Sequence, residues 1–457
     1  MPYEHTDFVL VVVFKYNWQL TAMSIFRSYD IRGLYGTDLT EDVMRRIGAA
    51  FAQVSTKMVT LAGDGRTSSL SLKKAFAEGF GRESVDVGTV PMGVGMLQAL
   101  GKNDYAYITG SHLSKEWNGV KFFHKNGLGF IDSENAEIAK IYKTVGITHR
   151  GASSKADTKK AIDDYVKYGA ARAAPQKKID VVLDCGNGAA GLAAKLLFTK
   201  AGFNTKAIFE NIDSRFSGRG PDPMEDPLNE LRKRSASADI GVAYDGDGDR
   251  MVIVDDKGRK LTPEQASYLI LLDAVKRPGP VIANVECTRM IDDVAKKFGK
   301  TVIRVPVGHT FLMDAVHKHA ACFGIEVSGH YAVPYMAPFD DSLLVSLYAA
   351  SVLSRQTRPL SQIIDEIKTY PFGRMSVSCH DDKKFAVVER LKKQLTKEYE
   401  LVSTLDGVRV DFPDGWILIR ASNTGPLIRL TVEGSDSRAY DRLKKEFEHT
   451  LNEEVRK

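Results

Sequence analysis

The sequence predicts an α/β protein that ends in a separate α+β module. A short apolar run of strand length, a glycine-bearing turn and a helical pattern recur along most of the chain. This alternation begins near Ile25 and stops near Pro371, where proline interrupts it. Beyond that point, two charged helical patterns flank three strand-like runs. Alternating strands and helices with short turns are typical of layered α/β domains.

The elements follow from these runs in chain order. Six apolar runs predict buried strands at Met58–Ala62, Tyr105–Thr109, Ile179–Asp184, Ile240–Tyr244, Pro280–Asn284 and Thr301–Val305. Helical patterns predict helices at Ser71–Gly79, Met290–Phe298, Lys383–Tyr399 and Arg438–Glu454.

Changes of composition predict the domain boundaries. Small, basic and polar residues dominate 151–178, a strand ends in an Asp-Asp-Lys-Gly turn before Pro263, and the pattern breaks again at Pro371. We therefore expect α/β domains at 23–160, 161–262 and 263–370, and an α+β domain at 371–457. Met23 opens the regular pattern, so residues 1–22 are expected to be an atypical N-terminal extension, with Met23 as an alternative start.

Composition and charge exclude several classes of protein. The 457 residues are 43% hydrophobic and 26% charged, which is ordinary for a globular protein. Lys and Arg number 63 against 58 acidic residues; the resulting charge of +5 suits small anions but is too small to predict a nucleic-acid partner. The longest apolar run, Phe8–Phe14, is far shorter than the roughly 20 residues that cross a bilayer. Four scattered cysteines, without a CxxC pair, favour a reducing cytoplasm.

The strongest chemical motif lies at 244–250. Asp245, Asp247 and Asp249 alternate with glycines, which allow the backbone to wrap so that the carboxylates converge. Carboxylates this close repel each other by about 1 kcal/mol per pair in water at 4 Å, and a hard cation such as Mg²⁺ or Ca²⁺ removes that cost. The alternative is a solvated acidic turn. An EF-hand is disfavoured, because Arg250 replaces its glycine and Asp256 its glutamate.

A second motif is Thr109-Gly110-Ser111-His112, followed by Asn118-Gly119-Val120-Lys121. A strand delivers Ser111 into a glycine-opened turn that can expose its hydroxyl. Serine needs a base, a metal or prior phosphorylation to react. Lys121 can return to the same cleft as a cationic or proton-transferring group. A serine in such a turn is otherwise a cap or turn former.

A third motif, at 420–429, combines hydroxyl, amide and guanidinium groups with glycine-freed backbone N–H groups. These groups make a suitable phosphate cradle, although a polar turn between strands has the same composition. Its residues are Arg420, Ser422, Asn423, Thr424 and Arg429. Further groups that can add to the same anion-binding cleft are Arg27, Tyr29, Arg32 and Asp64-Gly65-Arg66.

A fourth motif, at 324–330, contains Glu326, Ser328 and His330, and it is preceded by Gly308-His309-Thr310. Glutamate and serine two positions apart on an extended segment point the same way and can hold vicinal hydroxyls of a sugar. A lone histidine is more often structural, but two glycine-flanked loop histidines are better candidates for proton transfer.

The GxGxxG match at Gly186–Gly191, with Glu210 further on, is a weaker signal for a dinucleotide site. Asp184 lies two residues before the first glycine, where its charge would repel a pyrophosphate. A tight strand-to-helix turn is therefore the preferred interpretation.

From Met23 to the end, the chain resembles the α-D-phosphohexomutase superfamily. The segment IFRSYDIRG is similar to its N-terminal signature, TGSH…NGVK to its phosphoserine loop, DGDGDR to its metal loop, GIEVSGH to its sugar loop and RASNTGP to its phosphate loop. The RASNT form is more similar to the phosphomannomutase/phosphoglucomutase branch than to the phosphoglucosamine branch, whose loop usually reads RPSGTEP.

The resemblance implies three α/β domains with mixed sheets and a smaller α+β C-terminal domain around a central cleft. It implies an intramolecular phosphotransferase that interconverts hexose 6-phosphate and hexose 1-phosphate, with mannose and/or glucose as the sugar. The reaction would run through phosphorylated Ser111 and a hexose 1,6-bisphosphate, which also serves as activator. The expected partners are sugar phosphates, without nucleic acid or membrane, and the expected state is a monomer or homo-oligomer.

The resemblance also implies roles for individual residues. Mg²⁺ would be held by Ser111, Asp245, Asp247 and Asp249. Proton transfer or electrostatic support would come from Arg32, Lys121, His309 and His330. Sugar hydroxyls would be bound by Glu326 and Ser328, and the non-reacting phosphate by Arg420, Ser422, Asn423, Thr424 and Arg429. Tyr29, Arg250 and Thr310 are also expected to bind substrate.

Two departures from the family pattern bear on activity. Leu113-Ser114 follow Ser-His, where the family usually has Asn-Pro, and Ile325 replaces a glycine of the sugar loop. The alternatives that remain are a phosphoglucosamine mutase, a metal-dependent phosphatase and a non-catalytic sugar-phosphate-binding homologue. A nicotinamide dehydrogenase would rest on the GxGxxG match alone.

Overall fold

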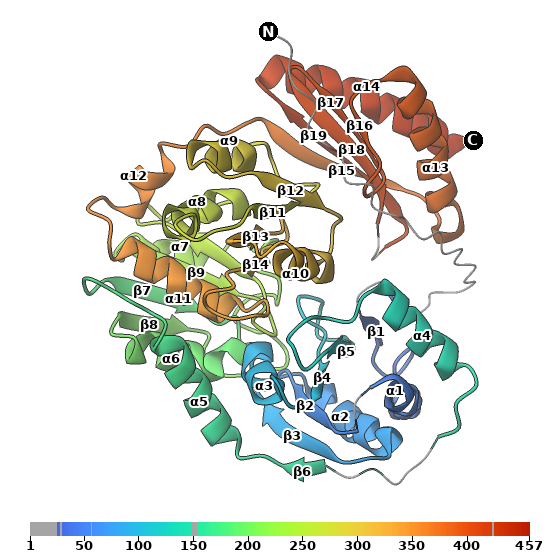
Figure 1. The fold of residues 1–457 in the computed structure, drawn as a ribbon, viewed down its shortest axis with the longest axis vertical. Coiled ribbons are helices and arrows are strands. Elements are labelled where there is room, and N and C mark those ends of the chain that lie inside the picture. Colours follow the sequence, from blue (N-terminus) through green and yellow to red (C-terminus); the bar gives the residue numbers. More distant parts are fainter. Residues whose placement is uncertain (1–24, 28–29, 56, 148–150, 152, 423–424) are drawn as a thin grey trace.

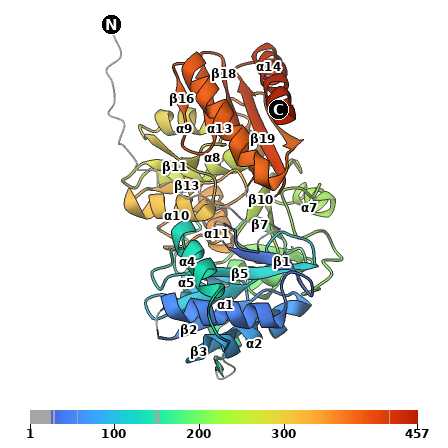
Figure 2. The same cartoon turned by 90° about the vertical axis from the view of Figure 1, so that its right-hand side faces the viewer.

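A computed structural model describes residues 25–27, 30–55, 57–147, 151, 153–422 and 425–457. The predicted extension at 1–22 lies outside these residues, as do Tyr29, Asn423 and Thr424. The described chain folds into four sheets (Figure 1). Figure 2 shows the first sheet and the C-terminal module at opposite ends of the molecule.

The first sheet is mixed and has the strand order β1-β5-β4-β2-β3-β6. Strands β2 and β4 are buried along their whole length, as expected for central parallel strands. The strands are β1 (Ile31–Leu34), β2 (Val59–Gly63), β3 (Ser84–Thr89), β4 (Asp104–Ile108), β5 (Trp117–Phe123) and β6 (Ser153–Lys155). The helices are α1 (Glu41–Val54), α2 (Thr67–Phe80), α3 (Met92–Ala99), α4 (Asp132–Tyr142) and α5 (Thr158–Ala170).

The second sheet, β10-β9-β7-β8, ends in an antiparallel hairpin of β9 and β10. The turn of this hairpin, 245–250, carries the predicted metal motif. The strands are β7 (Asp180–Asp184), β8 (Asn204–Ile208), β9 (Ile240–Tyr244) and β10 (Met251–Val254). The accompanying helices are the 3-10 helix Ala189–Leu192, α6 (Ala194–Lys200) and α7 (Asn229–Ser235).

The third sheet, β12-β11-β13-β14, has a parallel centre and an antiparallel edge at β14. The strands are β11 (Val281–Asn284), β12 (Val302–Val305), β13 (Phe323–Ile325) and β14 (Tyr331–Ala332). The helices are α8 (Pro263–Ala274), α9 (Met290–Lys297), α10 (His309–Lys318), α11 (Ser342–Leu353) and α12 (Leu360–Ile364). Every residue of α11 is buried.

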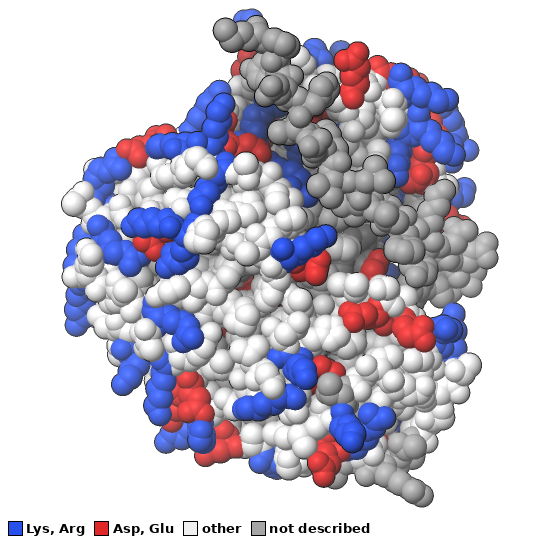
Figure 3. All heavy atoms as spheres, viewed as in Figure 1, with Lys and Arg blue, Asp and Glu red and all other residues white. Residues whose placement is uncertain are grey.

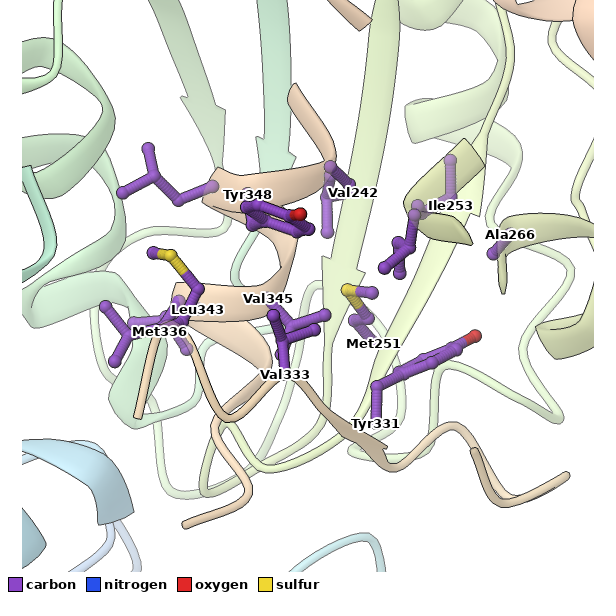
Figure 4. Close-up of a cluster of buried hydrophobic side chains, with 14 of the residues drawn as sticks. Val242, Met251, Ile253, Ala266, Tyr331, Val333, Met336, Leu343, Val345 and Tyr348 are labelled. Carbon is purple, nitrogen blue, oxygen red and sulfur yellow. The ribbon is translucent and has the colours of Figure 1, made fainter. Parts of the chain in front are cut away.

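The second and third sheets share one hydrophobic core. Val242 and Met251 of the second sheet pack with Tyr331 of the third and with Leu343 and Val345 of α11 (Figure 4). Burial of such side chains stabilises each by about 1.5–3 kcal/mol relative to exposure. This core fixes the β9–β10 turn relative to the β13–β14 loop, so their polar side chains meet in a defined geometry.

The C-terminal module is an antiparallel sheet, β15-β19-β18-β17-β16, covered by two helices. Its strands are β15 (Phe372–Ser378), β16 (Val402–Ser403), β17 (Val408–Phe412), β18 (Gly415–Ala421) and β19 (Leu427–Gly434). Its helices are α13 (Asp381–Glu398) and α14 (Ser437–Arg456).

Alternation along β18 gives this sheet two different faces. Ile417 belongs to the apolar core that α13 and α14 cover. Trp416 and Leu418, on the other face, form a small cluster with Val285 of the third sheet. Because side chains alternate along a strand, Arg420 lies on the same face as Trp416 and Leu418. The C-terminal module therefore turns its charged face toward the third sheet.

The sequence predictions for the fold are confirmed in class and in most elements. All six predicted strands are present, and Ile240–Tyr244 has the predicted bounds. The C-terminal sheet has five strands rather than three runs, because β15 precedes α13 and β16 is only two residues long. Among the described residues, no helix combines the length and apolar character needed to span a membrane.

Candidate active site

The carboxylate turn at 245–250 is folded around its own first residue. Asp245 Oδ1 accepts hydrogen bonds from the backbone N–H groups of Gly248 (3.0 Å), Asp249 (3.1 Å) and Arg250 (3.1 Å). Gly248 has φ +82°, which glycine adopts without strain. The turn therefore depends on both the aspartate and the glycine of the motif.

The three carboxylates of this turn form a buried cluster. One oxygen from each of Asp245, Asp247 and Asp249 lies within 4.8 Å of the other two. The Oδ1 atoms of Asp247 and Asp249 have no hydrogen-bond partner among the described residues. Burial, followed by the charges of Asp247 and Asp249, raises the pKa of Asp245 well above its usual value. A set of buried, mutually repelling oxygens fits a hard divalent cation.

Ser111 lies at this cluster, in the turn after β4. Its Oγ donates to Asp245 Oδ2 at 3.1 Å, and its backbone N–H donates to Thr109 Oγ1 at 2.7 Å. It adopts φ +48°, a conformation that is uncommon outside glycine. Strain of this kind collects at functional sites, where the surrounding structure enforces it.

Arg66 stabilises the serine turn through hydrogen bonds to its backbone. Its guanidinium donates to the backbone carbonyls of Ser111 (2.8 Å), Leu113 (2.6 Å) and Ser114 (2.6 Å), and its Nε donates to Asp64 Oδ2 at 3.0 Å. The side chain is buried, and these hydrogen bonds use four of its five N–H donors. Arg66 thus fixes the loop that carries Leu113-Ser114 rather than reaching toward an anion, as its place among the basic groups of the sequence had suggested.

Lys121 on β5 joins the same cluster. Its Nζ donates to Asp247 Oδ2 at 2.9 Å and to Asp249 Oδ2 at 2.5 Å. Burial lowers the pKa of Lys121, but the two carboxylates outweigh burial and raise it above its usual value. We call Ser111, Lys121, Asp245, Asp247 and Asp249 the serine centre.

The β13–β14 loop meets the serine centre through His330. His330 Nε2 lies 3.4 Å from Asp249 Oδ2, and its Nδ1 lies 2.9 Å from Ser328 Oγ. Ser328 Oγ donates to Glu326 Oε1 at 2.5 Å. Burial lowers the pKa of His330, but Asp249 and Glu326 raise it more, to about 9. Burial opposes ionisation of Glu326, yet His330 and Ser328 lower its pKa to about 2.

The start of α10 completes this side of the site. His309 stacks on His330 with ring centroids 5.3 Å apart, and its Nδ1 lies 3.2 Å from Asp340 Oδ2. Thr310 is buried beside it on the same helix. The two histidines named as candidates for proton transfer or electrostatic support therefore lie side by side.

Arg32 and Arg250 approach from the first and second sheets. Arg32 on β1 donates through Nε to Asp30 Oδ2 at 2.5 Å. Burial lowers the pKa of His112 well below its usual value, and the charges of Arg250, Arg32 and Lys121 lower it further. The charges of Asp249 and Asp245 raise the pKa of Arg250, against the effect of its burial, so Arg250 lies near these carboxylates.

The predicted phosphate motif lies on the C-terminal sheet. Arg420 on β18 stands directly opposite Arg429 on β19, and Arg374 on β15 shares their face. We call these three residues the arginine cluster. Ser422 follows β18, and its backbone carbonyl accepts a hydrogen bond from Lys384 Nζ at 2.6 Å. Asn423 and Thr424 lie outside the described residues.

A continuous set of contacts joins the serine centre to the arginine cluster. Gly308 N–H donates to Glu326 Oε2 at 2.8 Å, and the neighbouring Val307 N–H donates to Asp406 Oδ2 at 3.0 Å. Asp406 Oδ2 also accepts from Arg420 Nε at 3.0 Å. The β13–β14 loop therefore lies between the two charged regions.

The GxGxxG turn is filled by protein groups. Asp184 Oδ1 accepts from Gly186 N–H at 2.9 Å and from Arg219 Nε at 2.8 Å. Ala189 N–H donates to Gly246 O at 3.0 Å, so the turn braces the carboxylate hairpin. This arrangement is the tight strand-to-helix turn that the sequence favoured over a dinucleotide site.

On the face shown in Figure 3, basic and acidic side chains are interspersed.

Sequence reasoning missed several residues of the site. It assigned no role to the buried residues Asp340 and Lys384, or to Asp406. It placed Asp64 and Arg66 in the anion-binding cleft. The Asp-Gly-Arg sequence directly after β2 is the one local signal that marked a polar cluster at a strand end.

These sheets and contacts define a class: a multidomain α/β protein with a serine–carboxylate centre and a separate arginine cluster. The chain matches four family models, which together cover most of its length. They are described as "Phosphoglucomutase/phosphomannomutase, alpha/beta/alpha domain I" (residues 23–147), "domain II" (162–258), "domain III" (262–370) and "C-terminal domain" (375–450). The chain therefore belongs to the phosphoglucomutase/phosphomannomutase family of the α-D-phosphohexomutase superfamily.

Curated relatives carry two kinds of name. The chain is 30% identical over 441 residues to a probable phosphoglucosamine mutase of Methanopyrus kandleri, covering 92% of this chain and 96% of that protein. It is 31% identical over 444 residues to the phosphomannomutase/phosphoglucomutase of Pseudomonas aeruginosa, covering 94% and 95%. Both kinds of name describe phosphohexomutases, so the chain is a phosphohexomutase whose sugar these names leave open.

Solved structures share the whole fold. A phosphoglucomutase/phosphomannomutase family protein from Burkholderia thailandensis superimposes with a TM-score of 0.84 at 27% identity, covering 95% of this chain and 98% of that one. An Aspergillus fumigatus N-acetylphosphoglucosamine mutase, solved with GlcNAc-6P and magnesium, gives a TM-score of 0.59 at 14% identity, covering 93% and 95%. At that identity the likeness shows the fold alone.

Proposed function

We propose that this phosphohexomutase interconverts hexose 6-phosphate and hexose 1-phosphate through phosphorylated Ser111 and a 1,6-bisphosphate. One observation carries the proposal: a series of contacts joins Ser111 to Arg420. It runs from Ser111 through Asp245 and Asp249 to His330 and Glu326. From Glu326 it continues through the backbone at 307–308 and Asp406 to Arg420. A mutase needs one site that transfers a phosphoryl group and another that only holds the opposite phosphate. The two charged regions, with a hydroxyl-binding loop between them, supply both.

In the proposed reaction, phosphorylated Ser111 gives its phosphoryl group to the free hydroxyl of the substrate. The resulting bisphosphate turns by about half a turn and returns its other phosphate to Ser111. Ser111 is suited to this role because Arg66 and Thr109 fix its backbone, and phosphoryl transfer depends mainly on positioning and charge stabilisation. The departure at Leu113-Ser114 does not release the turn, since Arg66 holds both carbonyls.

We propose that Asp245, Asp247 and Asp249 hold Mg²⁺ together with the phosphate on Ser111. The two carboxylate oxygens without hydrogen bonds in the described structure support this assignment. Mg²⁺ bound there would neutralise charge that develops on the transferring phosphoryl group. Lys121 would add a positive charge at the same place.

The remaining residues are proposed to bind the sugar and move protons. Glu326 and Ser328 would accept and donate hydrogen bonds to sugar hydroxyls. His330, with its raised pKa, would keep a proton on its ring beside Asp249 and place a positive charge near the reacting hydroxyl. Electrostatic support would come from Arg32 and His309. Further contacts with the substrate would come from Arg250 and Thr310, and from Tyr29, which is assigned by its sequence position.

The arginine cluster, with Ser422, is proposed to hold the phosphate that does not react. Arg420 and Arg429 face each other across β18 and β19, so an anion placed between them relieves their repulsion. Asn423 and Thr424 would add an amide and a hydroxyl to this grip. A phosphatase would not require such a second site, which is why a mutase is preferred.

The test is a coupled assay with glucose 1-phosphate, mannose 1-phosphate and glucosamine 1-phosphate, each with and without the matching 1,6-bisphosphate as activator. We expect conversion of at least one substrate to its 6-phosphate, with loss of activity on chelation of Mg²⁺. Release of inorganic phosphate without any 6-phosphate would instead establish a phosphatase. Binding without turnover would establish a non-catalytic homologue. The cytoplasmic location and the monomeric or homo-oligomeric state stay predictions.

A further inference from the structure

The arginine cluster needs an anion even before substrate arrives. Arg420 and Arg429 are direct partners in the β18–β19 register. Arg374 is opposite Thr431, which is two residues from Arg429, so Arg374 lies on the same face. Like charges at neighbouring positions on one face of a sheet repel each other. Asp406 of the same module balances part of this charge, and a further negative charge must come from another element.

Glu286 from the third sheet supplies this balance. It lies two residues after β11 and is 1% exposed. Its Oε1 is 3.9 Å from Arg420 Nη1, and its Oε2 is 3.6 Å from Arg374 Nη2. Burial lowers the pKa of Arg429, and the charge of Glu286 opposes that change. One carboxylate therefore acts on all three arginines.

The contacts of Glu286 are ion pairs without hydrogen bonds. Both distances exceed the range of a hydrogen bond between nitrogen and oxygen. Its buried Oε1 has no hydrogen-bond partner among the described residues. A buried carboxylate oxygen in this state loses its hydration without full replacement. The Glu286 carboxylate thus offsets the positive charge of the arginines without being fixed to them by a hydrogen bond, so a phosphate can take its place as their counter-anion.

Asp406 makes a different kind of contact in the same place. It accepts a 3.0 Å hydrogen bond from Arg420 Nε and another from Val307 N–H. Asp406 therefore fixes the orientation of the Arg420 guanidinium from one edge. The Nη1 atom of Arg420 is directed toward Glu286. Both acidic residues offset the charge of Arg420, and the hydrogen bond to Asp406 also orients its guanidinium.

We propose that Glu286 is a positioning residue that acts as the exchangeable counter-anion of the arginine cluster. This inference rests on the proposed function, in which the cluster holds the non-reacting phosphate. A phosphate that enters meets the repulsion of Glu286 and binds less tightly. When that phosphate leaves, Glu286 balances the arginines again. The carboxylate thereby keeps the grip weak enough for the bisphosphate to leave the cluster and turn.

The proposal predicts a specific kinetic pattern. Because the 6-phosphate and the 1-phosphate occupy the cluster in alternate half-reactions, Glu286 affects both directions of the reaction. Removing its charge tightens binding of both monophosphates and of the bisphosphate intermediate. Tighter binding lowers KM, and slower turning of the intermediate lowers kcat, while kcat/KM changes little.

The experiment compares wild type with Glu286→Gln, which keeps the size of the side chain and removes its charge. We expect KM for hexose 1-phosphate and hexose 6-phosphate to fall about tenfold, and kcat to fall by a similar factor. Calorimetry should show a matching decrease in the dissociation constant for hexose 6-phosphate. Glu286→Asp keeps the charge and should stay within about twofold of wild type in KM.

Glu433→Gln is the matched control. Glu433 is buried on β19 at the same interface, but it pairs with Arg289 of the third sheet at 3.0 Å rather than with the arginine cluster. We expect this variant to leave KM unchanged. Glu286→Ser, which leaves room for water, gives the same comparison if thermal unfolding shows that Glu286→Gln does not fold.

Several results would overturn the inference. A KM that is unchanged or higher in Glu286→Gln shows that the carboxylate only joins the two parts of the fold. An equal decrease in KM for Glu433→Gln shows that the effect belongs to the interface in general. By contrast, a wild-type protein that neither binds nor converts any hexose phosphate contradicts the proposed function itself.

Discussion

The serine centre and the arginine cluster are both charged, yet they are built differently. The serine centre is buried, whereas in the arginine cluster Arg420 is buried, Arg429 half-buried and Arg374 exposed. In the serine centre, Lys121 Nζ donates at 2.9 and 2.5 Å, and Ser111 Oγ donates at 3.1 Å. In the arginine cluster, Glu286 meets Arg374 and Arg420 at 3.6 and 3.9 Å. The first region is fixed by hydrogen bonds. In the second, Asp406 holds Arg420 by a hydrogen bond, while Glu286 balances charge across the interface through longer ion pairs.

This difference suits the function that we propose for each region. Transfer of a phosphoryl group needs a nucleophile held in one geometry, because small displacements lower the rate steeply. The site that binds the opposite phosphate must release it once in each catalytic cycle, so the side chains of that site cannot be held as rigidly. The C-terminal module turns a charged face toward the third sheet and keeps its own core, an arrangement that suits such a movable grip.

The largest effect is expected at the serine centre. Ser111→Ala removes the hydroxyl that we propose carries the phosphoryl group, so we expect kcat to fall by about 10³-fold or more with the fold intact. The coupled assay and thermal unfolding measure the two properties. Ser114→Ala, in the same turn, is the control and should stay near wild type. Comparable turnover in Ser111→Ala would assign the nucleophile elsewhere.

A smaller effect is expected when the support beneath Ser111 is weakened. Arg66→Lys keeps the charge but cannot hold three carbonyls and Asp64 together, so we expect kcat to fall about 100-fold with KM little changed. Steady-state kinetics separate the two parameters. A rise in KM at constant kcat would mean that Arg66 binds substrate instead.

The opposite pattern is expected at the arginine cluster. Arg420→Lys loses the forked guanidinium that can bind two phosphate oxygens, so KM should rise about tenfold while kcat changes less. Together with Arg66→Lys, this variant tests whether positioning of Ser111 and binding of the non-reacting phosphate are separate functions. An unchanged KM would remove Arg420 from the phosphate site.

The smallest expected effect is on stability and concerns the interface beside the arginine cluster. Burial raises the pKa of Glu433 to about 7 from a usual value of 4.5, although hydrogen bonds from Arg289 oppose the shift. Between these pH values the folded chain keeps a proton that the unfolded chain has lost. The free energy of unfolding contributed by Glu433 is therefore full below about pH 4.5 and is lost as pH rises to about 7.

Urea unfolding of wild type and Glu433→Gln across this range provides the measurement. We expect the variant to show a flatter pH dependence, because its amide does not titrate. The same slope in both proteins would contradict the raised pKa.

The sequence predicted the parts of the site that are local in the chain. Asp245, Asp247 and Asp249 lie within five consecutive residues of one turn, and Arg420 and Ser422 lie in one short segment, so a pattern reveals them. Arg66 was recognised as basic, but its partners begin 45 residues later at the serine turn. No local pattern shows that a side chain will meet backbone carbonyls there.

Glu286 illustrates the same limit at longer range. In the sequence it is one acidic residue after a strand. Its interaction with the arginines becomes visible only when the fold brings three strands of another sheet close to it. The fold class was predictable because alternating apolar runs act through local periodicity. The strand β15 was missed because Pro371 interrupts the pattern just before it.

The most direct test of Ser111 as the phosphorylated residue is to map phosphate on the protein. Intact mass and peptide mapping of the purified enzyme, before and after incubation with a hexose 1,6-bisphosphate, should show one phosphate, located on Ser111. Addition of excess hexose 1-phosphate with bisphosphate removed should discharge it. An active enzyme that carries no phosphate, or carries it on another residue, would contradict the central claim.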